Sequence, residues 1–302
     1  MLEIFTAPSV VPGIEARVFI ALAFTGTAAY FDVFNKKWVP NILLYAFAAA
    51  ALLLNIVYFE QGIFISAAAF GIAAFLLSYP LYKTGQLGGA DVFCYASIAA
   101  AVPYLPKPFL NASAAAPYPF ILSALVPTGL LFIAHMFARF IPYIYARAKQ
   151  GKVDLSLAKL AIPATISLAF AVFAYVLSTL PIQLPPGYFV MLAFLLAALL
   201  FFSLFKEEIK QSMVGTVPVS KLHEEDVLAL EQMSPALVKK LKLEPVITKK
   251  LIAVLRAAKM KAVPVYVDMP CFLPYLFFGV LFTVLFGDLV SYVVASAMAV
   301  PY

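Results

Sequence analysis

Charged residues are scarce in this sequence. Only 12% of its 302 residues are charged and 64% are hydrophobic, whereas soluble domains have about 25% charged and roughly 45–50% apolar residues. Long stretches lack the polar face that a helix or strand needs in a soluble protein. The composition therefore excludes a soluble enzyme, a disordered chain and a collagen-like repeat, and it indicates an integral membrane protein.

Cysteine and histidine are also scarce. Cys94 and Cys271 are the only cysteines, which excludes a disulfide scaffold and an all-cysteine zinc site. The two histidines, His135 and His223, lie in no recognisable nucleophile–base pattern. The sequence has no HExxH, Walker A or dinucleotide-binding motif. We therefore expect no metal and no cofactor, and we interpret the net charge of +6 as a membrane-topology signal rather than as a sign of nucleic-acid binding.

Long apolar runs predict membrane helices. Residues 62–82 are apolar on every face, whereas the strands of a membrane barrel alternate apolar and polar residues. A helix crosses the bilayer with about 20 apolar residues, and eight runs approach this length. They are 11–31, 41–59, 62–82, 92–105, 118–137, 160–180, 188–205 and 272–298. Run 92–105 is short, so it crosses a thinned bilayer or is re-entrant. The prediction is an all-α, polytopic membrane helix bundle of about eight spans.

The basic residues orient this bundle. With the N-terminus outside and eight crossings, nineteen of the 21 lysines and arginines fall on one side, and only Arg17 and Lys107 fall on the other. The nineteen are Lys36, Lys37, Lys83, Arg139, Arg147, Lys149, Lys152, Lys159 and eleven residues within 206–261. The positive-inside rule places this side in the cytoplasm. A multi-pass protein of the plasma membrane is predicted.

One polar segment, residues 206–267, interrupts the apolar sequence. It carries eleven basic and seven acidic residues, and Ser234-Pro235 is typical of a helix N-cap followed by the first helical residue. We expect two or three short cytoplasmic helices here. The amphipathic, basic stretch 248–261 lies on anionic lipid or belongs to a solvated domain. The predicted domains are thus a membrane domain (1–205), a cytoplasmic helical insertion (206–267) and a final transmembrane helix (268–302).

Three aspartates stand in or beside the predicted spans, where a carboxylate costs about 2.5–3.5 kcal/mol. Asp32 and Asp91 lie at the cytoplasmic boundary, and Asp288 lies nearer the outer half, where we expect a structural role or exposure at the outer interface. Two carboxylates held together at low dielectric share a proton. One can then activate water while the other protonates a leaving amine, which is the chemistry of peptide hydrolysis.

The neighbouring residues support this interpretation. Asp91 ends the stretch Gly85-Gln86-Leu87-Gly88-Gly89-Ala90-Asp91, whose small residues allow a substrate backbone to approach. Asp32 opens a turn that contains Lys36 and Lys37 and ends at Pro40-Asn41. In the alternative interpretation both aspartates are interfacial: Asp32 pairs with Lys36 or Lys37, and Asp91 caps the fourth helix.

These motifs resemble the type IV prepilin peptidase family, and in particular its archaeal preflagellin and prepilin peptidases, which are membrane aspartic proteases of the GxGD type. The resemblance covers about residues 18–105 and, more weakly, 264–288. Ala90 replaces the glycine that precedes the aspartate in GxGD, and Phe93 stands where many members have lysine. The two distant cysteines argue against the cysteine-rich insert and the methyltransferase activity of many bacterial members.

The resemblance implies an endopeptidase that removes short basic leader peptides from prepilin-like or preflagellin precursors at the cytoplasmic membrane boundary. It implies that Asp32 and Asp91 are catalytic. Gly88, Gly89 and Ala90 are expected to shape the backbone around the substrate, and Lys36 and Lys37 to meet it. Two alternatives stay open at this stage: a presenilin-like intramembrane protease, and a proton- or cation-coupled transporter that uses the same aspartates. The sequence sets neither the natural substrate nor the oligomeric state.

Overall fold

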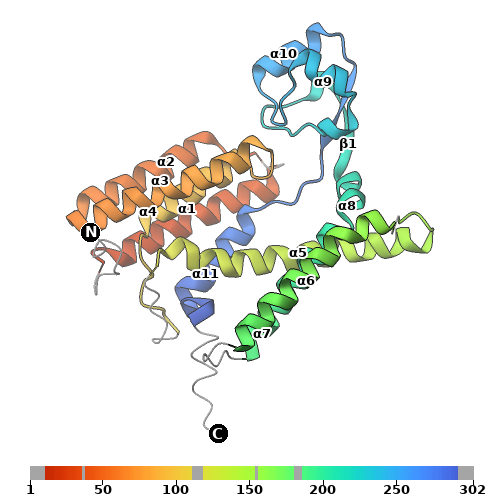
Figure 1. Ribbon diagram of the computed structural model, residues 1–302. Coiled ribbons are helices and arrows are strands. Elements are labelled where there is room, and N and C mark those ends of the chain that lie inside the picture. Colours follow the sequence, from red (N-terminus) through yellow and green to blue (C-terminus); the bar gives the residue numbers. More distant parts are fainter. Residues whose placement is uncertain (1–10, 36–37, 111–117, 154–155, 180–185, 292–302) are drawn as a thin grey trace.

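The computed structural model describes residues 11–35, 38–110, 118–153, 156–179 and 186–291 (Figure 1). Most of this part of the chain is α-helical, and every predicted apolar run contains a helix. These helices are α1 (Ile14–Phe34), α2 (Asn41–Val57), α3 (Gln61–Lys83), α4 (Gly89–Ala101), α5 (Phe120–Lys149), α6 (Leu157–Thr179), α7 (Pro186–Leu204) and α11 (Leu273–Phe286). The predicted all-α, polytopic membrane bundle is confirmed.

The helices differ in length. Among the described residues, five are long and apolar enough to cross a membrane, namely α1, α3, α5, α6 and α7. Helices α2, α4 and α11 are apolar but shorter, with 17, 13 and 14 residues. Helix α11 ends at Phe286, well before the predicted end at 298, because Gly287 adopts a φ of 82° and breaks the helix. The number of crossings stays a prediction.

Helix α4 lies in the middle of the main bundle, against α1, α2, α3 and α5. Its buried face includes Cys94, Ile98 and Ala101. Small residues permit close packing on α3, since a Cβ atom on Gly71 would lie 3.0 Å from the Cβ atom of Ala100. Such contacts are typical of membrane helix interfaces, and they enclose the short α4 within the protein.

Arg17 on α1 is fully buried. Its Nη1 donates to Asn55 Oδ1 on α2 and to the Ala101 carbonyl at the end of α4, both at 2.9 Å, and its Nε donates to the Pro12 carbonyl at 2.9 Å. The last carbonyls of a helix lack partners within the helix and carry partial negative charge. Arg17 therefore closes the ends of two helices and ties both to α1.

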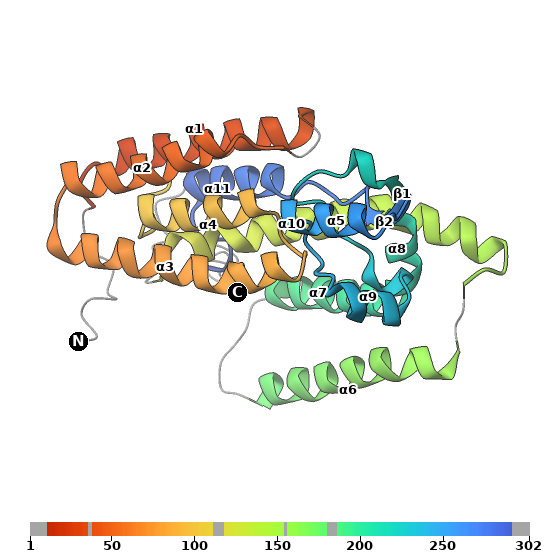
Figure 2. The ribbon, with the colours of Figure 1, turned by 90° about the horizontal axis from the view of Figure 1, so that it is seen from above.

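Helices α6 and α7 are peripheral to the main bundle. Phe137 on α5 packs edge-to-face on Phe194 and Phe201 and stacks on Phe202, all three on α7. Helix α6 packs mainly on α7 and lies at the edge of the molecule in Figure 2. Within its apolar window no residue is buried in the protein. This helix therefore presents an apolar surface to its surroundings, as a lipid-facing span does.

The polar segment forms a small unit with a hydrophobic core of its own (Figure 1). It begins with α8 (Lys206–Met213) and strand β1 (Val214–Pro218), contains the short helices α9 (Pro235–Leu241) and α10 (Lys249–Ala257), and ends with β2 (Ala262–Tyr266). Strands β1 and β2 pair antiparallel, and the sequence analysis did not predict them. Helix α9 begins at the expected Ser234-Pro235 pair.

Helix α10 turns its apolar face into this unit. Leu251 and Leu255 are buried in the core together with Val263 and Val265 of β2. Of the two interpretations of stretch 248–261, the structure supports a helix of a folded domain, because Leu251 and Leu255 are buried in the core of this unit.

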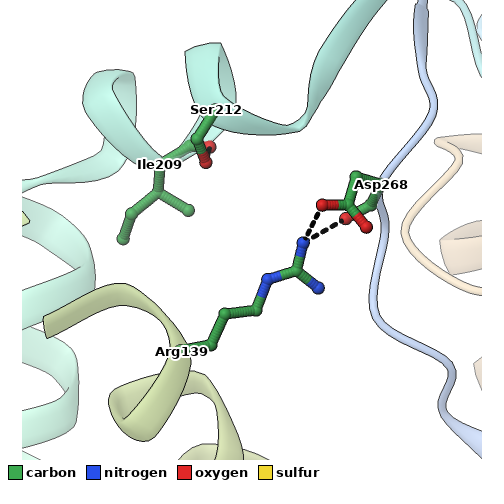
Figure 3. Close-up of polar contacts among 4 residues, drawn as sticks. All are labelled: Arg139, Ile209, Ser212 and Asp268. Atoms are coloured by element: carbon green, nitrogen blue, oxygen red, sulfur yellow. Dashed lines mark hydrogen bonds and ion pairs between the residues drawn. The ribbon is translucent and has the colours of Figure 1, made fainter. Parts of the chain in front are cut away.

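The chain returns from the polar segment to α11 through residues 267–272, which we call the connecting segment (Figure 3). The Arg139 side chain on α5 points at Asp268 and contacts both its carboxylate and its carbonyl oxygen, the latter at 3.0 Å. The amides of Val267 and Asp268 donate to the Met213 carbonyl at the end of α8. The connecting segment is thereby attached to α5 on one side and to α8 on the other.

Substitution of Gly279 tests the packing of α11 on α5. A Cβ atom at this position would overlap the Thr128 hydroxyl and lie 2.7 Å from the Ala124 carbonyl oxygen. We expect Gly279→Ala to lower the free energy of unfolding by about 1–3 kcal/mol, as overpacking does, measured by thermal unfolding in detergent. The matched control is Gly129→Ala on the facing helix, where a Cβ atom meets nothing within 4 Å. Equal melting temperatures for both variants would contradict the assigned packing.

Arg139→Ala tests the attachment of the connecting segment. Exposed ion pairs contribute about 0–1 kcal/mol, so global stability should hardly change, whereas the released segment should open more often. We expect faster modification of the partly exposed Cys271 by a maleimide, while the buried Cys94 stays unmodified. Lys249→Ala, which breaks another exposed ion pair (Lys249–Glu224), serves as the control. Unchanged labelling of Cys271 in Arg139→Ala would show that the contact does not hold the segment.

Candidate active site

Asp91 lies in the first turn of α4 and is buried. Its Oδ2 accepts a hydrogen bond of 2.8 Å from the amide of Gly88, the residue that precedes the helix. A carboxylate in this position is stabilised by the partial positive charge of the helix start. The capping geometry considered from the sequence is therefore present. The same carboxylate does more than cap the helix, because Asp91 also lines a pocket.

Asp32 lies in the last turn of α1 and is also buried. Its Oδ2 accepts a hydrogen bond of 3.2 Å from the Leu273 amide, the first residue of α11. The Cys271 thiol donates to the Asp32 carbonyl oxygen at 3.2 Å. The end of α1 is thus held against the start of α11. The predicted partners Lys36 and Lys37 lie outside the described residues.

The two aspartates come together because α1 packs against α4. They are close enough for the charge of Asp32 to act on Asp91. A pocket of about 190 Å³ opens beside Asp91. Its walls come from the stretch before α4 (Gln86, Leu87, Gly88), from α5 (Phe132) and from the connecting segment (Met269, Pro270, Phe272).

One wall of this pocket is aromatic. Phe272 stacks on Tyr95 of α4 with 6.0 Å between ring centroids and meets Phe132 edge-to-face at 5.6 Å. The stretch 86–88, which lines the same pocket, offers an amide side chain and backbone groups. The pocket therefore combines an apolar surface with a polar edge next to a carboxylate, a composition that suits a peptide substrate.

The glycine turn, residues 85–90, also contacts the polar segment. Gly85 has a φ of 73°, and a Cβ atom on it would lie 2.7 Å from Val227 Cγ1. Glu225 Oε1 lies 3.0 Å from the point that a Cβ atom on Gly89 would occupy. The sequence analysis did not identify Glu225. The sequence does contain one feature that points to it, because residues 224–226 are three consecutive acidic residues in a segment whose net charge is positive.

Glu225 has an unusual electrostatic environment. Partial burial of its carboxylate raises its pKa above the ordinary value for glutamate, and the nearby charge of Glu224 raises it further. Its charge in turn acts on Asp91. Three acidic side chains, Asp32, Asp91 and Glu225, therefore influence one small region at the start of α4.

The other predicted substrate-binding residues have different positions. Gly88 lines the pocket, and Gly89 faces Glu225. Ala90 packs against the hydrophobic core of the bundle and is not part of the pocket wall. Asp288, expected to be structural, is fully buried, and its Oδ2 accepts a hydrogen bond from the Ser291 amide at 2.7 Å. It caps the helical turn that follows Gly287.

Comparison with known proteins identifies the region that holds this site. Residues 19–133 match the model of the type IV leader peptidase family. No curated protein and no solved structure matches the chain. The matched region contains Asp32, the glycine turn, Asp91 and Phe132. Residues 19–133 of this membrane protein are therefore similar to the type IV leader peptidase family.

Proposed function

We propose that this protein is an aspartic endopeptidase in which Asp32 and Asp91 form the catalytic pair. The observation that carries the proposal is their geometry: two buried carboxylates, from helices far apart in sequence, lie within electrostatic reach of each other, and Asp91 lines a pocket. Each also accepts a hydrogen bond from a backbone amide at the start of a helix. Buried carboxylates in this arrangement share one proton.

The pair performs peptide hydrolysis as a unit. The ionised carboxylate takes a proton from water as the water oxygen attacks the scissile carbonyl carbon. The protonated carboxylate donates a hydrogen bond to the carbonyl oxygen, which stabilises the developing negative charge. When the tetrahedral intermediate breaks down, the C–N bond cleaves and a carboxyl proton passes to the leaving amine. Gly88, which lines the pocket, leaves room for an extended substrate backbone beside Asp91.

The proposed substrates are prepilin-like or preflagellin precursors, whose basic leader precedes a hydrophobic helix. Both aspartates lie at helix ends, where a cleavage site at the membrane boundary would meet them, rather than in the middle of a span as a presenilin-like mechanism requires. The aromatic wall formed by Phe132 and Phe272 suits the apolar residues that follow the cut. The family match favours this function over a transporter.

The proposed location is the plasma membrane, with the active site facing the cytoplasm. The distribution of lysine and arginine along the sequence supports this orientation, and the glycine turn contacts the basic polar segment. We propose the domain division 1–205, 206–267 and 268–302. In this division the final helix completes the site of the first domain, because the Leu273 amide holds Asp32.

Separate Asp32→Asn and Asp91→Asn variants test the catalytic pair. Asparagine keeps the size of the side chain and an acceptor oxygen, so the fold should persist while the shared proton is lost. We expect each variant, purified and reconstituted with a prepilin-like precursor, to cleave at least about a thousandfold more slowly than the wild type. The double variant should be no slower than either single one, since the two residues act as a unit.

Glu15→Gln is the control, because Glu15 is an exposed carboxylate at the opposite end of α1. It should cleave at the wild-type rate. Wild-type cleavage by either Asp→Asn variant would refute the catalytic pair, and failure of the wild-type protein to cleave any such precursor would refute the proposed substrate class.

A further inference from the structure

Three consecutive acidic residues on the polar segment differ in their partners. Glu224 forms an ion pair with Lys249, with 3.3 Å between Oε1 and Nζ. Asp226 accepts a hydrogen bond of 2.8 Å from the His223 amide. Glu225, between them, forms no ion pair with any residue in the described part of the chain. Among the described residues, its negative charge is thus not paired with a cation.

The backbone fixes the direction of the Glu225 side chain. Glu225 has a φ of 72°, a left-handed conformation that non-glycine residues rarely adopt. Two hydrogen bonds to the buried Ile247 hold it: the Glu225 amide donates to the Ile247 carbonyl at 2.9 Å, and the Ile247 amide donates to the Asp226 carbonyl at 2.8 Å. Strained residues of this kind concentrate at functional sites. The conformation is imposed by the core of the polar segment.

This conformation directs Glu225 at the active site. Its carboxylate faces Gly89 in the glycine turn and acts electrostatically on Asp91, yet it stays accessible to solvent. The raised pKa, caused by partial burial and by Glu224, shows that its surroundings do not compensate its charge. A lysine or arginine placed here would form a charge-assisted hydrogen bond, which is stronger than one between neutral groups.

We propose that Glu225 binds a lysine or arginine of the leader peptide and thereby makes the enzyme select basic leaders. This inference rests on the proposed function, because a basic leader must enter the pocket beside Asp91 for its positive charge to reach Glu225. Glu225 is then a specificity-determining residue, contributed by the polar segment to a site that the matched region 19–133 builds together with the connecting segment. The competing explanation is that Glu225 only helps to dock the polar segment on the glycine turn.

The test compares two precursors that differ only in the leader: one carries its natural lysines or arginines, and the other carries glutamine at those positions. For the wild type we expect a higher kcat/KM on the basic precursor. In Glu225→Gln, kcat/KM on the basic precursor should fall about tenfold, the usual size of a hydrogen bond to a charged group, mainly through KM. The ratio of kcat/KM on the basic precursor to kcat/KM on the neutral precursor should therefore fall to about one, so that the preference disappears.

Glu224→Gln is the matched control, because it removes the same charge one residue away from a side chain that already has Lys249 as a partner. It should retain the preference. The charge-reversed variant Glu225→Lys should reject the basic leader further, and a leader with glutamate in place of its basic residues should restore cleavage by this variant.

A merely structural role predicts a different pattern. If Glu225→Gln slows both precursors by the same factor, Glu225 serves only as a docking contact and the proposal is wrong. Leader-peptide binding, measured without cleavage, separates this proposal from the proposed function. Fluorescent basic and neutral leader peptides are bound to Asp91→Asn protein and to the double variant that also carries Glu225→Gln. Binding that weakens only for the basic peptide supports the Glu225 proposal even where no cleavage is seen, and equal binding overturns it.

Discussion

The arrangement of the site depends on hydrogen bonds between buried carboxylates and the first backbone amides of helices. Asp91 accepts one from Gly88 at the start of α4, and Asp32 accepts one from Leu273 at the start of α11. A helix start offers amides without partners in its own helix and a partial positive charge. These bonds stabilise carboxylates that would otherwise be costly in an apolar bundle, and the bond between Leu273 and Asp32 holds α1 against α11.

The same physical rule explains the other buried charges. Arg17 satisfies the carbonyl at the end of α4 and joins it to α2, and Asp288 caps the helical turn after Gly287. In a membrane protein an unsatisfied backbone group has no water to bind. Arg17 and Asp288 therefore each stand where a helix begins or ends, and Arg17 in addition joins α1 to α2 and α4.

The polar segment has its own hydrophobic core but does not stand apart from the site. Val227 packs on Gly85, Glu225 faces Gly89, and the connecting segment supplies part of the pocket wall. The contact between Arg139 and Asp268 attaches that segment to α5. A displacement of the polar segment would therefore change the shape of the pocket beside Asp91. The position of this small unit would in this way affect substrate binding.

The sequence by itself determined the membrane character, the positions of the apolar helices and the two aspartates with motif context, because hydrophobicity and the cost of a buried charge are properties of local sequence. It left Leu273 and Glu225 unnoticed and missed the pairing of β1 with β2, since each depends on residues distant in the chain. Only the tertiary structure decided which amide holds Asp32 and which acidic residue faces the glycine turn. The reason is that helix packing, not local propensity, brings residue 273 to residue 32 and residue 225 to residue 89.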